Sequence, residues 1–383
     1  MIMIINEAGE YTLQYTATDA CGNSTTVQRD LVVEPPPYYG AVWDGSTSTK
    51  WTRTGQSVGL ADPQPAVNNG TGSSPFDNIM PWSGMEIVED AEAGTLVKIP
   101  KFYYQWVRDG ASMELRIANE QLDGFFTSPA HADRGDGVGE RDVVYVGRYH
   151  CSNVDYKSTT GVLPKGSVTR ENFRTSIHAL GSNIWQYDFA MYWTICMLYL
   201  VEFADWNSQA CIGYGCGTTS SKANEGATDA MQYHTGTNAA NRETYGEIQY
   251  RHIEGLWSNV WDWVDGIYFN NNDVYAIKNP TDFSDNANGT FVSTRAVSDG
   301  VPQTFTEPTA SGYEYALYPA TATGFDYAAR TCDRYFFGSS GGVLSVGGSY
   351  DSHGQVSGLF FLNGSKSATD SLNIIGSRLQ KLP

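Results

Sequence analysis

A regular alternation of apolar and polar residues runs through the N-terminal segment. Over residues 8–34, Tyr11, Leu13 and Tyr15 fall on one face with polar residues between them, which is the period of a β-strand. The sequence DACGN at residues 19–23 is typical of a turn. The pattern therefore predicts a β-hairpin. Because a lone hairpin is only marginally stable in water, we expect upstream strands of a longer chain or a neighbouring molecule to cover its apolar face.

Two segments further along have the spacing of helices. Phe173, Ile177 and Leu180 recur at every third or fourth position, which places them on one helical face. Thr169 precedes them as a candidate N-cap, and Gly181 follows as a stop signal. These residues predict a short amphipathic helix.

The second helical segment begins after Asp188, which can cap a helix over residues 189–207. Its apolar run, FAMYWTICMLYLV, has 13 residues, fewer than the roughly 20 that span a bilayer. Because the run is apolar on nearly all sides, we expect this helix to lie in the core of the protein.

Short apolar runs between Gly, Pro, Asn and Ser predict β-strands elsewhere. They cover residues 97–106, 114–118, 143–149, 266–277, 290–295, 343–344, 359–362 and 372–375. Together with two helices, these strands predict an α+β fold class with irregular, short strands. Three prolines at residues 35–37 predict a stiff linker. We therefore expect a β-module with its linker over residues 1–36 and one binding domain over residues 37–383.

The C-terminal segment, residues 331–383, has an unusual composition. It holds 9 Gly and 10 Ser in 53 residues, and it has no Trp, Met or Glu. Gly at this density permits tight turns between short strands, and loops on a rigid scaffold are where binding residues gather. The composition favours a binding surface. The alternative is a Gly/Ser-rich β-structure that binds no ligand.

The charge and the cysteine content argue against several classes of function. The net charge is −18, and without a local basic patch this disfavours a nucleic-acid role. Six cysteines in 383 residues, none in a CxxC pair, do not indicate a disulfide scaffold. The N-terminal sequence MIMIINEAGEY has no basic stretch, so we expect no secretory signal peptide. Aromatic residues make up 13% of the chain and suit either a binding surface or a β-rich core.

Candidate catalytic residues are few. The six histidines show no HxH or HExxH spacing, so the sequence predicts no zinc site. Arg251, His252 and Glu254 could perform acid–base chemistry, but we expect them to support the tryptophan-rich element that surrounds them. Residues 134–136 spell Arg-Gly-Asp, which we interpret as an acidic, Gly-rich turn.

The tryptophan-rich element resembles a family motif. Residues 250–266, YRHIEGLWSNVWDWVDG, resemble the R-G-I-E-N-x-W-G-N-x-W-E-W-x-D-G element of two groups of proteins. One group is the variable proteins of diversity-generating retroelements, such as the phage major tropism determinants; the other is the formylglycine-generating enzymes. His252 and Ser258 replace glycines of the motif, and the first replacement bears on the local turn more than on the fold.

Further segments extend this resemblance over about residues 80–383. They are IPKFYY at 99–104, LYLVEFAD at 198–205 with the strand expected after it at 213–215, GGSY at 347–350, GLF at 358–360 and IGSRL at 375–379. The N-terminal YTATDACGN resembles the last two strands of immunoglobulin-like domains of bacterial and phage surface proteins.

The resemblance implies a C-type lectin fold that displays a diversified binding surface. Mutagenesis in this family acts on adenines and does not produce Trp, Met, Glu, Gln or Lys, so Gln355 and Lys366 are poor candidates for diversified positions. The contact residues that it implies are Tyr335, Phe337, Ser339, Ser340, Tyr350, Asp351, Ser352, His353, Ser357, Phe361 and Asn363. The scaffold residues that it implies are Gly347, Gly348, Gly358, Gly376 and Arg378.

The function implied is that of a phage or prophage receptor-binding protein. We expect a tail-fibre adhesin of the virion, or alternatively an adhesin on a bacterial surface. Its expected partners are a bacterial cell-surface protein or glycan and the proteins of the phage tail. A homotrimer is the family expectation, and we expect no nucleic acid, no membrane insertion and no cofactor.

An enzyme with the same fold is the alternative from another class. Formylglycine-generating enzymes act through paired cysteines that carry copper, whereas Cys332 is the only cysteine of this C-terminal segment. We therefore expect no enzymatic activity. The Glu-Pro-Asn, Gln-Pro-Asp and Trp-Asn-Asp motifs of calcium-dependent lectins are also missing. Asp262, Asp265 and Asp273 stay candidates for a structural cation site.

Overall fold

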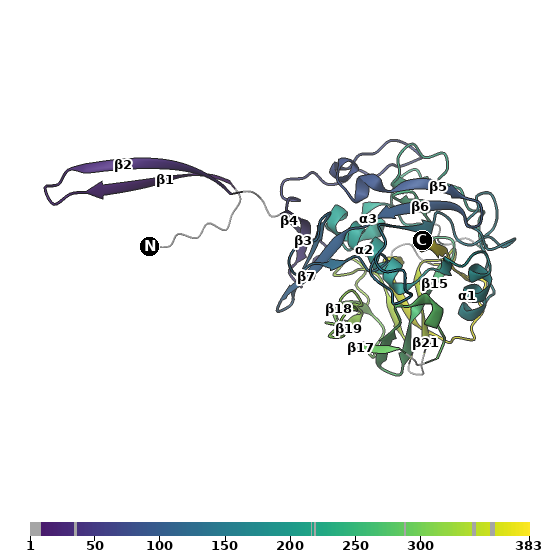
Figure 1. Cartoon of the computed structure of the whole chain (residues 1–383). Helices are drawn as coiled ribbons and strands as arrows, with labels where there is room; N and C mark the ends of the chain where they lie inside the picture. The colour runs from purple at the N-terminus through teal and green to yellow at the C-terminus, as the bar shows by residue number, and fades with distance from the viewer. Residues whose placement is uncertain are drawn as a thin grey trace.

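The computed structural model describes most of the chain. The described residues are 9–33, 37–215, 217, 220–286, 289–338, 342–352 and 357–383. Over these residues the protein is mostly β-structure with few helices, an α+β composition that confirms the coarse fold class (Figure 1).

The N-terminal hairpin forms as predicted. β1 (Gly9–Thr18) and β2 (Ser24–Val33) pair antiparallel over their whole length, and the Asp19 carboxylate accepts bonds from two backbone N–H groups of the turn. In Figure 1 the hairpin stands apart from the rest of the chain. Tyr15 and Val27 pair across its strands and stay mostly exposed. Within the described residues, its apolar face is therefore uncovered.

Two five-stranded sheets contain the first strands of the body. Their orders are β4-β3-β8-β7-β9 and β11-β24-β10-β6-β5. The strands of the first are β3 (Tyr39–Trp43), β4 (Thr52–Gly55), β7 (Tyr103–Asp109), β8 (Ser112–Ala118) and β9 (Phe126–Thr127). Those of the second are β5 (Glu86–Asp90), β6 (Gly94–Pro100), β10 (Val143–Gly147), β11 (Ile184–Gln186) and β24 (Leu379–Lys381). The last strand of the chain thus lies inside the second sheet.

A third sheet carries most of the C-terminal segment. Its order is β17-β16-β15-β21-β22-β20, and β23 pairs with β15 off this path. The strands are β15 (Trp261–Asn270), β16 (Asp273–Ala276), β17 (Thr290–Thr294), β20 (Tyr335–Phe337), β21 (Gly342–Gly347), β22 (Gly358–Lys366) and β23 (Ile375–Gly376). Smaller sheets use β12 (Gly236–Thr237), β13 (Ile248–Tyr250), β14 (Ile253–Glu254), β18 (Val301–Phe305) and β19 (Pro319–Thr323). Three 3-10 turns complete the elements, η1 (Pro75–Asn78), η2 (Trp82–Gly84) and η3 (Pro280–Asp282).

Several predicted strands have other bounds in the structure. The single strand expected over residues 97–106 is wrong, because β6 ends at Pro100, which has no N–H to donate to the sheet, and β7 continues in a different sheet. The strand expected over residues 266–277 is a hairpin, with Asn271 at φ 54° in the turn. No strand forms at residues 213–215.

Both predicted helices are confirmed, with one end corrected. α1 (Arg170–His178) begins after Thr169, whose side chain accepts a bond from a backbone N–H. α2 (Phe189–Phe203) begins after Asp188 and is buried at every residue. It packs against β3, β8 and β15, which explains why no polar face is needed. It ends before the expected residue 207 because Ala204 adopts a left-handed conformation, and the short α3 (Ser208–Cys211) follows.

Candidate binding surface

The tryptophan-rich element forms a rigid back to the C-terminal segment. Trp257 and Trp263 are buried, and their indole N–H groups donate to the backbone carbonyls of Gly213 and Val168. β15, which carries Trp263, pairs with β21 and β23. Buried aromatic rings with satisfied N–H groups suit a fixed support.

Two predicted scaffold glycines lie directly on this element. A Cβ on Gly347 would come within 2.4 Å of the Leu256 carbonyl oxygen, and one on Gly348 within 2.5 Å of the Trp257 carbonyl oxygen. Gly347 also has a φ of 87°. Side chains at these positions would collide with backbone, so the turn that follows β21 is seated closely on the tryptophan-rich element.

Arg378 ties the end of the chain to the same element. It is fully buried, and its Nε donates to Asp262 Oδ2 at 3.0 Å. Its two Nη groups donate to the carbonyls of Gly147 and Glu254, each at 2.9 Å. Nη2 also lies 3.2 Å from Nε2 of His150. A charge-assisted network of this kind fixes β10, β15 and the C-terminus relative to one another.

Three buried glutamates surround this network. Burial raises the pKa of Glu225 to about 7, and burial with the neighbouring glutamates raises the pKa values of Glu247 and Glu254. Burial also lowers the pKa of His150 to about 4, and its Nδ1 lies 3.2 Å from Glu225 Oε1. Glu254 accepts bonds from two backbone N–H groups of the 226–228 segment. The cluster is buried, and its members bond to one another and to the backbone.

The acid–base candidates of the tryptophan-rich element make bonds within the chain. Arg251 donates to both carboxylate oxygens of Glu202, at 2.8 and 2.6 Å, and both residues are buried. Burial lowers the pKa of His252 to about 3. His252 has a φ of 72°, so this position adopts a conformation that favours glycine, the residue that the family motif has there.

The Arg-Gly-Asp sequence is not displayed as a recognition loop. Arg134 is buried and its Nη2 donates to Asp188 Oδ2 at 2.6 Å. The Asp136 carboxylate accepts a bond from Arg141. Both charges are therefore neutralised within the chain, as expected for a structural turn.

The aspartates proposed for a cation are not assembled into a site. Asp262 binds Arg378, and Asp265 accepts bonds from Arg174 at 2.5 and 2.9 Å. Over the described part of the chain, no group of three or more His, Cys, Asp or Glu residues has an arrangement that could hold a metal ion.

The predicted contact residues divide into three groups. Asp351 is exposed, and Tyr350, Ser352 and Phe337 are half-buried. The turn that carries Tyr350 is held by its backbone N–H, which donates to the Asn259 carbonyl at 2.9 Å. Ser339, Ser340 and His353 lie outside the described residues, as does Gln355.

The remaining four predicted contact residues are buried, and the prediction is wrong for them. Tyr335, Ser357, Phe361 and Asn363 expose at most 2% of their surface. The Phe361 ring stacks on Trp261 with centroids 5.5 Å apart. From Gly358 to Gly364, β22 is covered on both faces, so neither set of alternating side chains reaches solvent there. Sequence reasoning missed this because it treated the segment as a loop-borne surface.

Other aromatic residues lie at the surface beside this segment. Phe325 is 55% exposed. The Arg334 guanidinium lies 5.1 Å from the Phe325 ring centroid and 3.7 Å from that of Phe336. Phe336 is half-buried and was not among the predicted contacts, because Tyr335 and Phe337 on the opposite face of the strand were expected to be exposed.

The main feature that the sequence did not reveal is an open groove of about 850 Å³ beside the C-terminal segment. It is lined by Pro65, Val67, Asn207, Gln209, Ala210, Tyr214, Asn241, Arg242, Glu243, Asp326, Tyr327 and Ala328. These residues come from four separate segments. No motif links those segments, so only the fold brings them together.

The floor of the groove is joined to the C-terminal strands. Gln209 is buried, and its Nε2 donates to Asp333 Oδ1 at 2.6 Å and to the Ser357 carbonyl. Asp333 also accepts the Phe360 N–H at 2.8 Å. Burial raises the pKa of Asp333 to about 7, while these two donors favour its ionised form. The floor is therefore held by buried hydrogen bonds.

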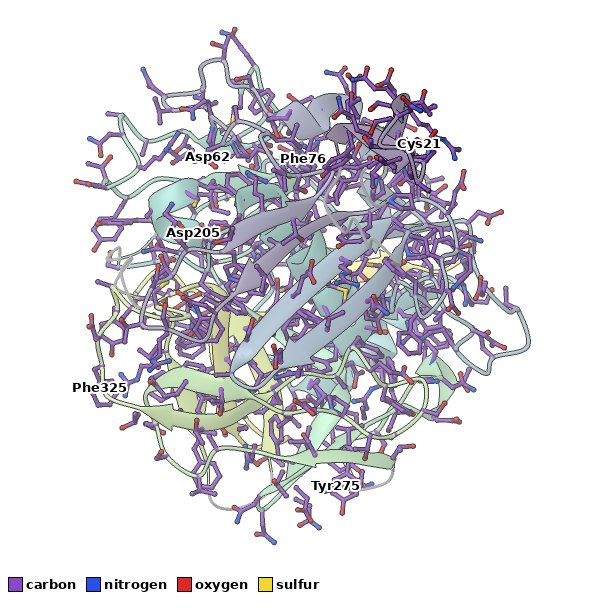
Figure 2. The ribbon with its side chains drawn as sticks, turned by 90° about the vertical axis from the view of Figure 1, so that its left-hand side faces the viewer. Cys21, Asp62, Phe76, Asp205, Tyr275 and Phe325 are labelled. Carbon is purple, nitrogen blue, oxygen red and sulfur yellow. The ribbon has the colours of Figure 1, made fainter. Side chains whose placement is uncertain are left out.

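The groove is continuous with the turn that carries Tyr350. A Cβ on Gly217 would meet both the Ser352 carbonyl oxygen and the Tyr245 ring, so these two groups are neighbours. The Tyr245 ring lies 6.1 Å from that of Tyr214, which lines the groove. The two features form one candidate surface, which we call the rim surface: residues 207–214, 241–245, 325–328 and 350–352. Figure 2 shows Asp205 and Phe325 on the side of the body where this surface lies.

No family model matches the chain, and no curated protein matches it. Among the helices of the described residues, none has the length and apolar character needed to cross a membrane.

Proposed function

We propose that this protein is a receptor-binding protein, an adhesin that uses a C-type lectin fold of the retroelement-variable type to display a ligand-binding surface. The observation that carries the proposal is the division of the C-terminal segment. Its strands are paired with the tryptophan-rich element, whereas its turn at 350–352 lies at the rim surface, together with the turn at 325–328 that precedes the segment. A fixed frame with exposed turns is an arrangement that tolerates exchange of surface residues.

A cysteine-based enzyme is less well supported. Burial raises the pKa of the Cys332 thiol well above its usual value, and the thiol pKa values of Cys151 and Cys196 are raised for the same reason. Buried neutral thiols are poor nucleophiles and poor metal ligands. We therefore propose a binding role without catalysis, carried in a phage tail or on a bacterial surface.

The first test is binding to whole bacterial cells. The purified full chain is labelled and incubated with a panel of strains that includes the source bacterium. The double variant Tyr350→Ala with Asp351→Ala should lose capture, whereas Tyr275→Ala, which changes a ring on β16 outside the rim surface (labelled in Figure 2), should bind normally. Equal loss in both variants, or no binding to any strain, would overturn the proposal.

The second test concerns diversification. Sequencing the neighbourhood of the gene should show a reverse transcriptase and a near-identical repeat of the 3′ coding region. Differences between the repeats should fall at adenines, in codons for exposed turn residues rather than in those for Phe361 or Asn363. Absence of the repeat would overturn the proposal that the protein is diversified by a retroelement. The proposal that it is an adhesin would then depend on the cell-binding test alone.

A further inference from the structure

The chemistry of the groove selects a class of ligand, and this inference rests on the proposed adhesin function. The groove volume, about 850 Å³, lies in the upper part of the range of roughly 300–1,000 Å³ typical of small-ligand sites. A smaller hollow of about 200 Å³, which shares Ala210 and Arg242, extends it towards Asp62 and Asp205. Figure 2 shows these two aspartates on the same side of the body. The two adjoining hollows together leave room for a chain of small units.

Two tyrosines supply flat apolar surfaces to the groove. Tyr214 follows α3, and Tyr327 comes from the turn after β19. Each is half-buried. Tyr214 is backed by the Tyr245 ring at 6.1 Å, and Tyr327 by the Phe325 ring at 6.3 Å. Rings held in this way offer a face for packing together with a hydroxyl at the edge.

Side-chain amides supply directional hydrogen bonds. Asn207 and Asn241 use their Oδ1 atoms to accept backbone N–H groups of the protein. These contacts orient the two side chains and leave each Nδ2 donor without a partner among the described residues. An amide fixed by its own oxygen presents two N–H donors in a set direction.

The charges disfavour an anionic ligand. The lining holds one cation, Arg242, and two anions, Glu243 and Asp326. Arg242 already donates to the Pro65 carbonyl at 3.3 Å. A polyanion would meet more negative than positive charge here, on a chain whose net charge is −18.

An extended peptide also lacks its usual partner. Such peptides commonly add to an open strand edge, where main-chain hydrogen bonds supply affinity. None of the lining residues belongs to a strand. The groove instead offers rings, amides and carboxylates from side chains on turns and on α3.

We propose that this groove binds an uncharged oligosaccharide, with the C–H faces of the sugar rings packed on Tyr214 and Tyr327 and the hydroxyls bonded to Asn207, Asn241 and Asp326. All of the groove-lining residues precede residue 331, so they lie outside the C-terminal segment that the family diversifies. The glycan subsite would thus be constant while the adjacent turn at 350–352 varies.

The experiment uses the purified full chain on a printed array of neutral, sialylated and sulfated oligosaccharides, followed by calorimetry with the best neutral oligosaccharide. Neutral glycans should bind and their charged counterparts should not. Tyr327→Ala should weaken binding at least about tenfold, as truncation of a central aromatic contact does. Tyr327→Phe keeps the ring and should retain most of the affinity, and Asn241→Ala should weaken it by less than Tyr327→Ala.

Tyr275→Ala is the matched control, and melting temperatures should confirm that every variant is folded. Binding of charged glycans alone, or equal affinity of wild type and Tyr327→Ala, would overturn the glycan assignment. The same protein is also screened against a random dodecapeptide library. If it captures peptides and Tyr327→Ala abolishes that capture, the glycan assignment is overturned as well. If cells are bound but no glycan is, the glycan site is wrong and the adhesin proposal stands. If neither is bound, both fail.

Discussion

Two polar regions of this protein differ in where their hydrogen bonds go. Around Arg378 and Asp262, charged groups bond to one another and to buried carbonyls, and no solvent reaches them. At the rim surface, Asn207 and Asn241 keep Nδ2 donors that have no partner among the described residues. Polar groups of the first kind hold a structure together, because a buried charge without its partner is costly. Those of the second kind can be exchanged with little effect on folding.

The largest expected effect is at the centre of the buried network. Arg378→Ala should destabilise the protein by about 3–5 kcal/mol, because it leaves Asp262 as a buried charge without its partner. Urea denaturation of the purified chain measures this loss. Lys98→Ala, which breaks the exposed pair with Glu86, is the control and should cost about 0–1 kcal/mol. Similar losses of stability in the two variants would contradict the distinction between the buried network and exposed polar groups.

Two single variants compare how much a strand residue and a turn residue of the C-terminal segment contribute to stability. Phe361→Ala removes a ring that is buried against Trp261 and should cost about 3–5 kcal/mol. Tyr350→Ala changes a half-buried turn residue and should cost about 0.5 kcal/mol or less. Thermal unfolding followed by circular dichroism separates them. Equal melting temperatures would mean that β22 is more open than its burial indicates.

The buried carboxyls should make stability depend on pH. The pKa of Glu225 in the folded state, about 7, lies above its ordinary value, and that of Glu247 is also raised. The folded state then binds more protons than the unfolded state from about pH 4.5 upwards. His150 has a lowered pKa, so its opposing effect is confined to pH below about 6.5.

Between pH 6.5 and about 8.5, the glutamates should therefore dominate. The free energy of unfolding should fall by about 1 kcal/mol or more, which is a few degrees in melting temperature. Glu247→Gln retains the Oε1 acceptor used by the Ile248 N–H and should reduce the slope. Calorimetry at a series of pH values checks both points, and a melting temperature that rises over this interval would show that the glutamates are ionised.

The smallest expected effect on stability is at His252, which stands where the family motif has a glycine. His252 has a φ of 72°, which strains a residue with a Cβ. His252→Gly should stabilise the protein by about 0.5–1 kcal/mol, after the greater chain entropy of glycine is taken into account. Chemical denaturation with an unchanged m-value would support this, whereas destabilisation would mean that the histidine ring is needed where it packs near His234.

The sequence by itself determined the local elements. Strict alternation predicted the hairpin of β1 and β2, and the caps Thr169 and Asp188 predicted where both helices begin. The apolar composition of α2 predicted its place in the core. These features depend on neighbours in the chain, so propensity and spacing are sufficient to indicate them.

Only the tertiary structure decided which residues of the C-terminal segment face solvent. Phe361 and Asn363 are enclosed because β22 lies between β21 and β20 and is covered on both faces, and no local pattern records that cover. The groove likewise depends on four segments that are distant in sequence, from Pro65 to Ala328. The burial of β22 and the assembly of the groove both depend on long-range packing. The physical reason is the same in both cases, because the side chains that exclude water come from distant parts of the chain and not from adjacent residues.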